Sequence, residues 1–400
     1  MRDGWRLGLL GDLIEEVKGA PVPDPWNHQL ATVRLYARGI QAAGRNPNQT
    51  KRGRAHYFRR SGEILVGRQN FHHQCVGVVP IELDGYVTSN AISAFKASDG
   101  ADPSFAYLVM AAGDTAKAAD DLMPGTGQRE ISVKKLLSIP VVIPPLAEQR
   151  RIVDLIDALD DAIEAVEVEA LELDRVISRL RIVRTEAPVK PLGELLLAID
   201  SGMSVASSAN ETTGLKMLRI SAVQHGRFDL AEFKYVGDAE LPERARLYEG
   251  DLLMTRSNTP DRVGYVSIAE GVDSDYFFPD LVWRLVPKRD VVDTRYLMDI
   301  LSSDYGRSEI MARASGTSAS MQKVSKARIA TVPVPVPSLE EQSAYVAPIQ
   351  SAQGALRAAR AHAEALRALR SNLLTVLLSG EHEIPLSYDE FLTRNEGVAA

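Results

Sequence analysis

Two long stretches of this 400-residue chain repeat one another. The segment PVVIPPLAEQRRIV at 140–153 returns as PVPVPSLEEQSAYV at 333–346, with a constant offset of 193 residues. Upstream, GEILVGRQN (62–70) matches GDLLMTRSN (250–258) at an offset of 188, and LGDLIEEVKG (10–19) matches LGELLLAIDSG (192–202) at an offset of about 182. Such drift is expected when loops are inserted into duplicated copies. Because a repeat determines architecture, we predict two similarly folded domains.

Each Pro-rich segment is followed by a helical pattern with heptad spacing. In the first copy, apolar residues alternate at intervals of four and three: Ile152, Ile156, Leu159, Ile163, Val166, Ala170, Leu173, Ile177 and Leu180. This spacing is typical of a coiled-coil seam. The positions 193 residues later keep the pattern, interrupted only by Arg370: Tyr345, Ile349, Ala352, Leu356, Ala359, Ala363, Leu366, Arg370 and Leu373. Ser338 and Glu341 have capping-box spacing at the start of the second helix, and Pro188 and Pro191 end the first.

The order of these segments determines how the two helices would pair. The first helix leads from one globular segment to the next, and the second helix starts from that next segment, so a pair must be antiparallel. About 39 residues from Ala147 to Thr185, at a rise of 1.5 Å, would form a spacer of roughly 58 Å. A generic scaffold is the alternative for the helices alone. Two similar domains at a fixed separation instead favour a reader of a split DNA site.

The predicted fold class is α+β, with two duplicated domains joined by a long antiparallel coiled coil in a pseudo-two-fold arrangement. We expect domains at 1–146 and 188–337, helices at 147–187 and 338–380, and a tail at 381–400. The hydrophobic content of 45% is enough for two cores. One cysteine cannot form an intramolecular disulfide, the first residues lack the order of a signal peptide, and no apolar run approaches about 20 residues. We therefore expect a cytoplasmic protein that does not span a membrane.

Charge is distributed unevenly along the chain. The net charge of −7 argues at first against binding to nucleic acid. However, 34–68 contains one acid, Glu63, and nine basic residues, and aromatic residues are interleaved with them. The basic residues are Arg34, Arg38, Arg45, Lys51, Arg52, Arg54, Arg59, Arg60 and Arg68, and the interleaved rings belong to Tyr36, His56, Tyr57 and Phe58. By contrast, 147–187 has six basic and eleven acidic residues, so we expect this helix to contact protein partners rather than DNA.

The most specific motifs are two boundary elements, ISVKKLLSIPVVIPPLAEQRRI (131–152) and VSKARIATVPVPVPSLEEQSAYV (324–346). The first element starts with Ile-Ser and the second with Val-Ser. In both, a Pro-rich segment follows and leads into the L-x-E-Q opening of a helix. With these elements, the chain resembles the specificity subunit of type I restriction-modification systems over nearly its whole length. Two departures are visible: the first helix lacks the Ser cap of the second, and the two domains match weakly between their ends. The resemblance implies two target-recognition domains, each reading one half of a bipartite DNA site.

The resemblance also implies partners. They are double-stranded DNA, two methyltransferase (modification) subunits that bind S-adenosylmethionine, and restriction/translocase subunits that use ATP and Mg. The chain itself is expected to carry no cofactor. In this family the assembly methylates DNA and defends the cell against phage.

Candidate DNA contacts fall into two groups. For phosphates the candidates are Arg52, Arg54, Arg59 and Arg60, in or beside the loop-like stretch GRNPNQTKRGR, where a solvated charge run is the alternative. For base edges, Arg68, Gln69 and Asn70 correspond to Arg256, Ser257 and Asn258 in the second copy. Arg, Asn and Gln have the geometry to bind guanine or adenine edges, although an ordinary polar turn would look the same. Weaker candidates are Arg262, Gln322 and Lys323.

No motif in the sequence indicates catalysis. A Walker-type loop, a Gly-rich dinucleotide fingerprint, an N/D-P-P-Y motif and a cysteine-ligand cluster are all missing. His72, His73 and Cys75 lack a second pair of ligands, so we expect no metal site and no catalytic residue. The expected function is sequence-specific DNA recognition without catalysis. The alternatives are a coiled-coil adaptor whose domains bind proteins, and a specificity subunit of another methylation-based defence system.

Overall fold

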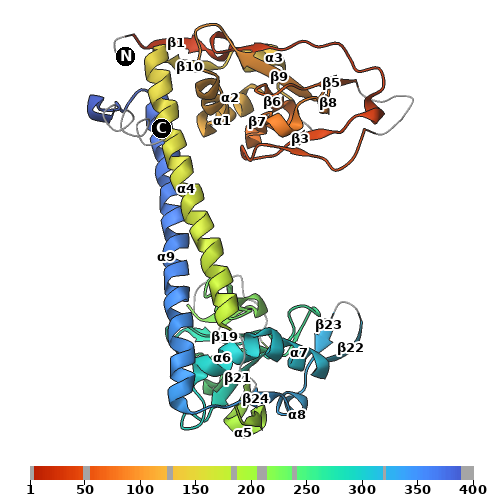
Figure 1. The fold of residues 1–400 in the computed structure, drawn as a ribbon, viewed down its shortest axis with the longest axis vertical. Coiled ribbons are helices and arrows are strands. Elements are labelled where there is room, and N and C mark those ends of the chain that lie inside the picture. The colour runs from red at the N-terminus through yellow and green to blue at the C-terminus, as the bar shows by residue number, and fades with distance from the viewer. Residues whose placement is uncertain are drawn as a thin grey trace. The chain divides into compact units, whose positions relative to one another are not determined.

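The computed structural model describes residues 4–47, 55–123, 129–181, 187–204, 214–236, 241–318 and 321–388. The chain forms two compact units. Unit 1 comprises Met1–Glu167 and Ala361–Ala400, and unit 2 comprises Val168–Arg360. The long helices α4 (Leu146–Leu180) and α9 (Leu339–Leu378) each contribute one part to each unit. Each unit therefore contains a globular part and a segment of both helices (Figure 1).

Unit 1 is built on an antiparallel four-stranded sheet in the order β2-β9-β6-β7. Its strands are β2 (Ile14–Glu16), β6 (Ile64–Gly67), β7 (Val76–Val78) and β9 (Ile92–Ala97). Three two-stranded sheets accompany it: β1 (Arg6–Leu9) with β10 (Pro140–Ile143), β3 (Ala31–Val33) with β4 (Ile40–Ala42), and β5 (His56–Phe58) with β8 (Val87–Ser89). The helices α1 (Pro103–Ala111), α2 (Gly113–Leu122) and α3 (Val133–Leu137) follow β9, and the 3-10 segment η3 (Arg68–His73) follows β6. In Figure 1, β3, β5 and β8 lie on the other side of β6 from α1.

Unit 2 repeats the same topology, with the strand order β12-β21-β17-β19. These strands are β12 (Leu196–Ser201), β17 (Leu252–Thr255), β19 (Val266–Ile268) and β21 (Val282–Pro287). The strands β11 (Val189–Pro191) and β24 (Pro333–Pro335) pair as β1 and β10 do, and the helices α6 (Thr294–Ser302), α7 (Asp304–Arg313) and α8 (Lys326–Ile329) follow β21. The helix α5 (Leu192–Leu195) precedes β12. The duplication predicted from the sequence thus extends to strand order and helix order.

Unit 2 also has strands without an equivalent in the sheet of unit 1. A three-stranded sheet contains β13 (Lys216–Leu218), β16 (Phe233–Tyr235) and β20 (Tyr276–Phe277), and β14 (Val223–Gln224) pairs with β15 (Arg227–Phe228). A second three-stranded sheet contains β18 (Ser257–Asn258), β22 (Ser315–Ser318) and β23 (Met321–Lys323). Most of these strands come from the regions in which the two copies match weakly in sequence.

The central strands form because their sequences are continuous apolar runs bounded by turns. In β6, Ile64, Leu65 and Val66 are fully buried, and in β17 all four residues are buried. A strand that is covered on both faces needs apolar side chains on both, which explains why GEILVG and GDLLMT do not alternate in polarity. The fold class predicted from the sequence is confirmed, with the first long helix ending at Leu180, before the predicted boundary.

The two long helices pack together in antiparallel fashion. In unit 1, Asp160 of α4 pairs with Arg370 of α9, and Glu167 pairs with Arg367; in unit 2, Asp174 pairs with Arg360. Partner numbers on α9 fall as numbers on α4 rise, as an antiparallel pair requires. All the predicted seam positions are buried or half-buried. The predicted interruption at Arg370 is an ion pair across the helix pair, with Arg370 Nη2 lying 2.7 Å from Asp160 Oδ2.

The L-x-E-Q openings, which the two copies share, have the same structural explanation in both units. Gln149 at the start of α4 accepts a hydrogen bond from the backbone N–H of Asp102 at 2.9 Å and donates to the carbonyl of Pro144. Gln342 at the start of α9 accepts from the N–H of Asp293 at 2.7 Å and donates to the carbonyls of Val291 and Pro337. Both aspartates are N-caps, of α1 and α6 respectively. Each glutamine thus links a long helix to the capped helix of its own unit.

Candidate nucleic-acid interface

In unit 2, the structure brings together candidate residues that are far apart in the sequence. Asn258 lies opposite Gln322, and Ser257 lies opposite Lys323, in the register of β18 and β23. The N–H of Val324 donates to the carbonyl of Arg256 at 3.0 Å, which extends the pairing by one residue. The small sheet β18-β23-β22 therefore collects the predicted base readers of the second copy with two of the three weaker candidates.

The side chains on this sheet differ in how many of their polar atoms already form hydrogen bonds or ion pairs. The guanidinium of Arg256 makes no ion pair with any residue that the structure describes, and Lys323 is exposed and equally unpaired. Gln322 is half-buried, and its buried Oε1 has no hydrogen-bond partner among the described residues. Asn258 Oδ1 accepts a hydrogen bond from the N–H of Thr259 at 2.9 Å, which leaves its amide nitrogen available. An Arg, a Lys and two carboxamides on one sheet provide the donors and acceptors that base edges and phosphates require.

Two further candidates of unit 2 are placed differently. Ser257 is buried, so its side chain points into the protein and does not fit a base contact. Arg262 is exposed on the turn that precedes β19, where its nearest carboxylate is that of Asp261 at 3.4 Å. Because both side chains of that pair are largely exposed, the interaction is weak and leaves Arg262 free to contact a phosphate.

In unit 1, the corresponding segment forms a 3-10 helix instead of a strand. Arg68, Gln69 and Asn70 all lie in η3. The guanidinium of Arg68 is bonded to Glu130 Oε1 at 2.5 and 2.8 Å and to Ser93 Oγ at 2.9 Å. Asn70 is exposed, whereas Gln69 is half-buried. Arg68 can therefore reach DNA only by releasing Glu130, while Asn70 is accessible as it stands.

The predicted phosphate-binding cluster requires one correction. Arg59 is only 4% exposed, and its guanidinium donates to Thr88 Oγ1 at 2.6 Å and to the carbonyl of Ile92 at 2.7 Å. Burial lowers the pKa of this guanidinium. Its donors are used to connect β5, β8 and β9, so Arg59 does not fit a phosphate contact. The sequence could not reveal this, because Arg59 and the exposed Arg60 are neighbours with the same side chain.

The remaining arginines of the cluster are at the surface or outside the described residues. Arg60 is exposed and lies 3.4 Å from Asp84, and Arg34, Arg38 and Arg45 are exposed. Arg52 and Arg54 fall outside the part of the chain that the structure describes.

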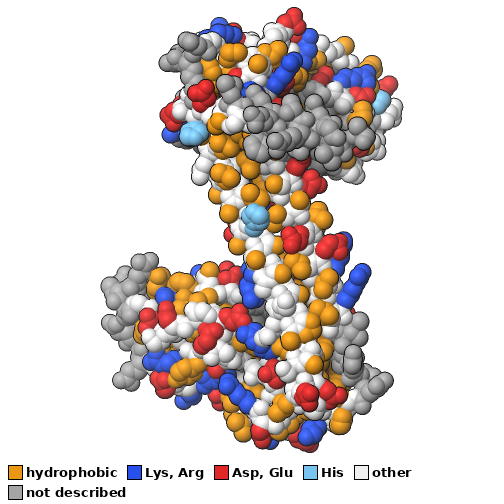
Figure 2. All heavy atoms as spheres, turned by 60° about the vertical axis from the view of Figure 1, so that its left-hand side comes forward, with side chains coloured by type: hydrophobic (Ala, Val, Ile, Leu, Met, Phe, Trp, Pro, Cys, Tyr) orange, Lys and Arg blue, Asp and Glu red, His pale blue; other side chains and the backbone are white. Residues whose placement is uncertain are grey.

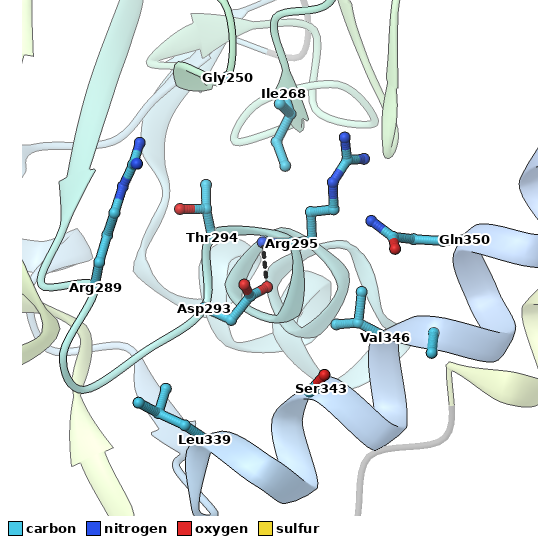
Figure 3. Close-up of a pocket in the computed structure, with 11 residues that line it drawn as sticks. Gly250, Ile268, Arg289, Asp293, Thr294, Arg295, Leu339, Ser343, Val346 and Gln350 are labelled. Carbon is cyan, nitrogen blue, oxygen red and sulfur yellow. Dashed lines mark hydrogen bonds between the residues drawn. The ribbon is translucent and has the colours of Figure 1, made fainter.

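A separate cavity of about 570 Å³ lies in unit 2 beside the start of α9. Figure 3 shows Asp293, Thr294 and Arg295 at the start of α6 facing Val346 and Gln350 of α9. Its best-placed charges are already paired: Asp293 Oδ1 accepts from the N–H groups of Arg295 and Tyr296, and Arg295 bonds to Glu270 at 3.1 Å. We therefore do not assign this cavity to the DNA interface.

Two kinds of feature are absent from the described residues. No group of three or more His, Cys, Asp or Glu side chains in these ranges is arranged to hold a metal ion. No helix among them is both long enough and apolar enough to cross a membrane.

Comparison with known proteins finds a family match over part of the chain and related proteins of known class. Residues 40–173 match the model of the type I restriction modification DNA specificity domain. The type I restriction enzyme MjaVIII specificity subunit of Methanocaldococcus jannaschii is 21% identical over 280 residues, which cover 64% of this chain and 65% of that protein. The EcoKI specificity subunit of Escherichia coli K12 is 27% identical over 236 residues, which cover 53% of this chain and 49% of that protein. The matched regions thus span less than two thirds of either relative.

Solved structures share the fold over almost the whole chain. A chain from work on complex assembly and conformational transition of the type I R-M system superimposes with a TM-score of 0.57 at 18% identity, covering 94% of this chain and 98% of that one. The S subunit of a type I restriction-modification system from M. genitalium gives a TM-score of 0.53 at 13% identity, covering 95% and 97%.

Proposed function

We propose that this chain, which contains a type I restriction-modification DNA specificity domain and is related to type I specificity subunits, is the DNA sequence-specificity subunit of such a system. It is non-catalytic and cytoplasmic, and it reads a bipartite DNA site. Its target-recognition domains occupy 1–146 and 188–337, and its helices occupy 147–187 and 338–380. The observation that carries the proposal is the duplication, because two units with the same strand and helix order suit a site with two halves.

Recognition would divide between phosphate contacts and base contacts. In the second domain, Arg256, Asn258 and Gln322 are the proposed base readers, and Lys323 and Arg262 are the proposed phosphate contacts. In the first domain, Asn70 and Gln69 would read bases, Arg68 would do so after leaving Glu130, and Arg52, Arg54 and Arg60 would contact phosphates.

The partners in this proposal are two methyltransferase subunits and, in a complete system, restriction/translocase subunits. S-adenosylmethionine, ATP and Mg would be bound by those partners. Figure 2 shows hydrophobic side chains at the surface along the two helices, and on α4 the exposed ones include Val168, Leu171 and Val176. Exposed apolar side chains on a helix that is otherwise charged support a protein contact there.

Selection of binding sites from random DNA tests the proposal. The chain would be purified together with its methyltransferase partners and allowed to select from a random library. We expect one motif made of two short specified halves around an unspecified gap. A protein-binding adaptor, the rival function, would show no preference among DNA sequences. A single continuous motif would contradict the assignment of one half to each domain.

A further inference from the structure

The strands β3 and β4 form a separate two-stranded ribbon in unit 1. Its register pairs Thr32 with Gln41 and Val33 with Ile40. Val33 and Ile40 pack on a buried cluster that includes Leu65. Because neighbouring residues of a strand point to opposite faces, Thr32 and Gln41 lie on the outer face of the ribbon. Gln41 is exposed, and its amide makes no hydrogen bond to the described residues.

The loop at the tip of this ribbon, residues 34–39, has an unusual backbone conformation that hydrogen bonds hold in place. Tyr36 and Ala37 have φ angles of 60° and 50°, a left-handed conformation that is rare for residues other than glycine. Such conformations are strained and persist only where surrounding contacts impose them. Here the N–H of Tyr36 donates to the carbonyl of His73, and that of Ala37 donates to the carbonyl of Gln74, both at 2.8 Å. The tip is therefore attached to the end of η3.

This backbone directs side chains outward instead of burying them. The Tyr36 side chain is 58% exposed although it is a large aromatic group. The Arg38 guanidinium lies 5.9 Å from the centre of the Tyr36 ring, and the His73 ring lies 6.1 Å from it. Arg34 and Arg38 are exposed and form no ion pair with the residues that the structure describes. An exposed, basic and aromatic tip that is hydrogen-bonded to the end of η3, the segment that contains Asn70, has the composition of a DNA contact.

We propose that the β3–β4 ribbon is the main reading element of unit 1 and lies in the major groove of the half-site that this unit recognises. The major groove admits a two-stranded β-ribbon. Gln41 would present its carboxamide to a base edge, Arg34 and Arg38 would contact phosphates, and the Tyr36 ring would pack against the DNA at the tip. This inference rests on the proposed function and adds the residues that would determine specificity in one half-site.

The test uses the full chain with its methyltransferase partners and a library of random DNA. Gln41→Ala should relax the preference at one or more positions of one half-site and leave the other half unchanged. Tyr36→Ala should weaken binding at least tenfold, whereas Tyr36→Phe, which keeps the ring, should stay close to wild type. Arg38→Gln should reduce the slope of log affinity against log salt by about one, in proportion to one lost phosphate contact.

Matched substitutions in the same unit control for surface effects. Lys117→Gln removes an exposed charge from α2, and Ile81→Ala removes an exposed apolar side chain; neither should change affinity or salt slope. If the wild-type complex selects a bipartite motif and Gln41→Ala and Tyr36→Ala behave like these controls, the ribbon is not the reading element. If the wild type selects no motif at all, the proposed function fails, and this inference fails with it.

Discussion

At the residue scale, the glutamines of the two L-x-E-Q motifs show why a short sequence signal can mark a domain boundary. Gln149 and Gln342 are both buried, and each satisfies a backbone N–H at the N-cap of a helix in its own unit. A buried N–H that loses its acceptor retains its full desolvation penalty. The motif therefore marks the place where a long helix is hydrogen-bonded to the globular part of its unit. It predicts the fold better than it predicts any contact with DNA.

Replacement of Gln342 tests how much these hydrogen bonds contribute to stability. Gln342→Ala removes three hydrogen bonds and leaves the N–H of Asp293 unsatisfied, so the free energy of unfolding should fall by about 1 to 3 kcal/mol. Denaturant titration provides the measurement. Glu340→Ala, at an exposed position two residues earlier, should change it by less than about 0.5 kcal/mol. Equal losses of unfolding free energy in the two variants would show that the Gln342 hydrogen bonds make no specific contribution to stability.

Asp299 should make the stability of unit 2 depend on pH. Its side chain is buried and paired with Arg181 at 2.9 Å; burial raises the pKa of Asp299 to about 6, and Arg181 acts in the opposite direction. Because this folded value exceeds the reference value of 3.8, the stabilising contribution is full below pH 3.8 and is lost as the pH rises through about 6. Relative to Asp299→Asn, wild type should lose up to about 3 kcal/mol between pH 4 and pH 7.

Urea unfolding of both proteins across this range measures the difference. Because all other carboxylates titrate in both proteins, their contribution to the pH dependence of stability cancels when wild type is compared with the asparagine variant. A difference that does not change with pH would mean that Asp299 keeps an ordinary pKa.

At the element scale, the long helices were the most predictable part of the chain. The seam positions from Ile152 to Leu180 needed only a count of spacing, and the structure buries or half-buries all of them. The interruption at Arg370 could be located from the sequence but not explained, because Asp160 lies 210 residues away and only the folded pair brings them together.

The recognition surfaces were much less predictable. The matching motifs GRQN (67–70) and TRSN (255–258) both begin at the last residue of a central strand. The chain then enters the 3-10 helix η3 at Arg68 in the first copy, whereas Ser257 and Asn258 form the strand β18 in the second. That difference depends on β23, which pairs with β18 from 64 residues further along the chain. A local pattern contains no information on such a distant strand, so the pairing of Asn258 with Gln322 could not be foreseen.

A charge at a buried seam position of the helix pair should destabilise the protein far more than a change at an exposed position of the same helix. Ile156 is fully buried in the core of unit 1, and Ile156→Asp would bury an unpaired carboxylate there. We expect a loss of several kcal/mol in the free energy of unfolding. Glu164→Gln, on the exposed side of the same helix, should have little effect. Thermal unfolding compares the two, and similar melting temperatures would mean that the assigned register is wrong.

At the scale of the whole molecule, we predict that the helices set the gap between the two half-sites. Four residues inserted after Ala170 in α4 and four after Ala363 in α9 would add about 6 Å to the helix pair while nearly preserving the seam. At 3.4 Å per base pair, the preferred gap should grow by one or two base pairs. Site selection with the lengthened chain measures the gap. An unchanged gap in a folded variant that still binds DNA would exclude the helices as the determinant of spacing.

At the same scale, we expect this chain alone to decide which DNA its proposed partners modify. Methylation mapping across a genome, in cells that express the methyltransferase partners with and without this chain, tests it most directly. We predict that modified bases appear only when the chain is present, and that all of them lie in one bipartite motif with a fixed gap. Methylation at the same sites without the chain, or modification that follows no bipartite motif when it is present, would contradict the account.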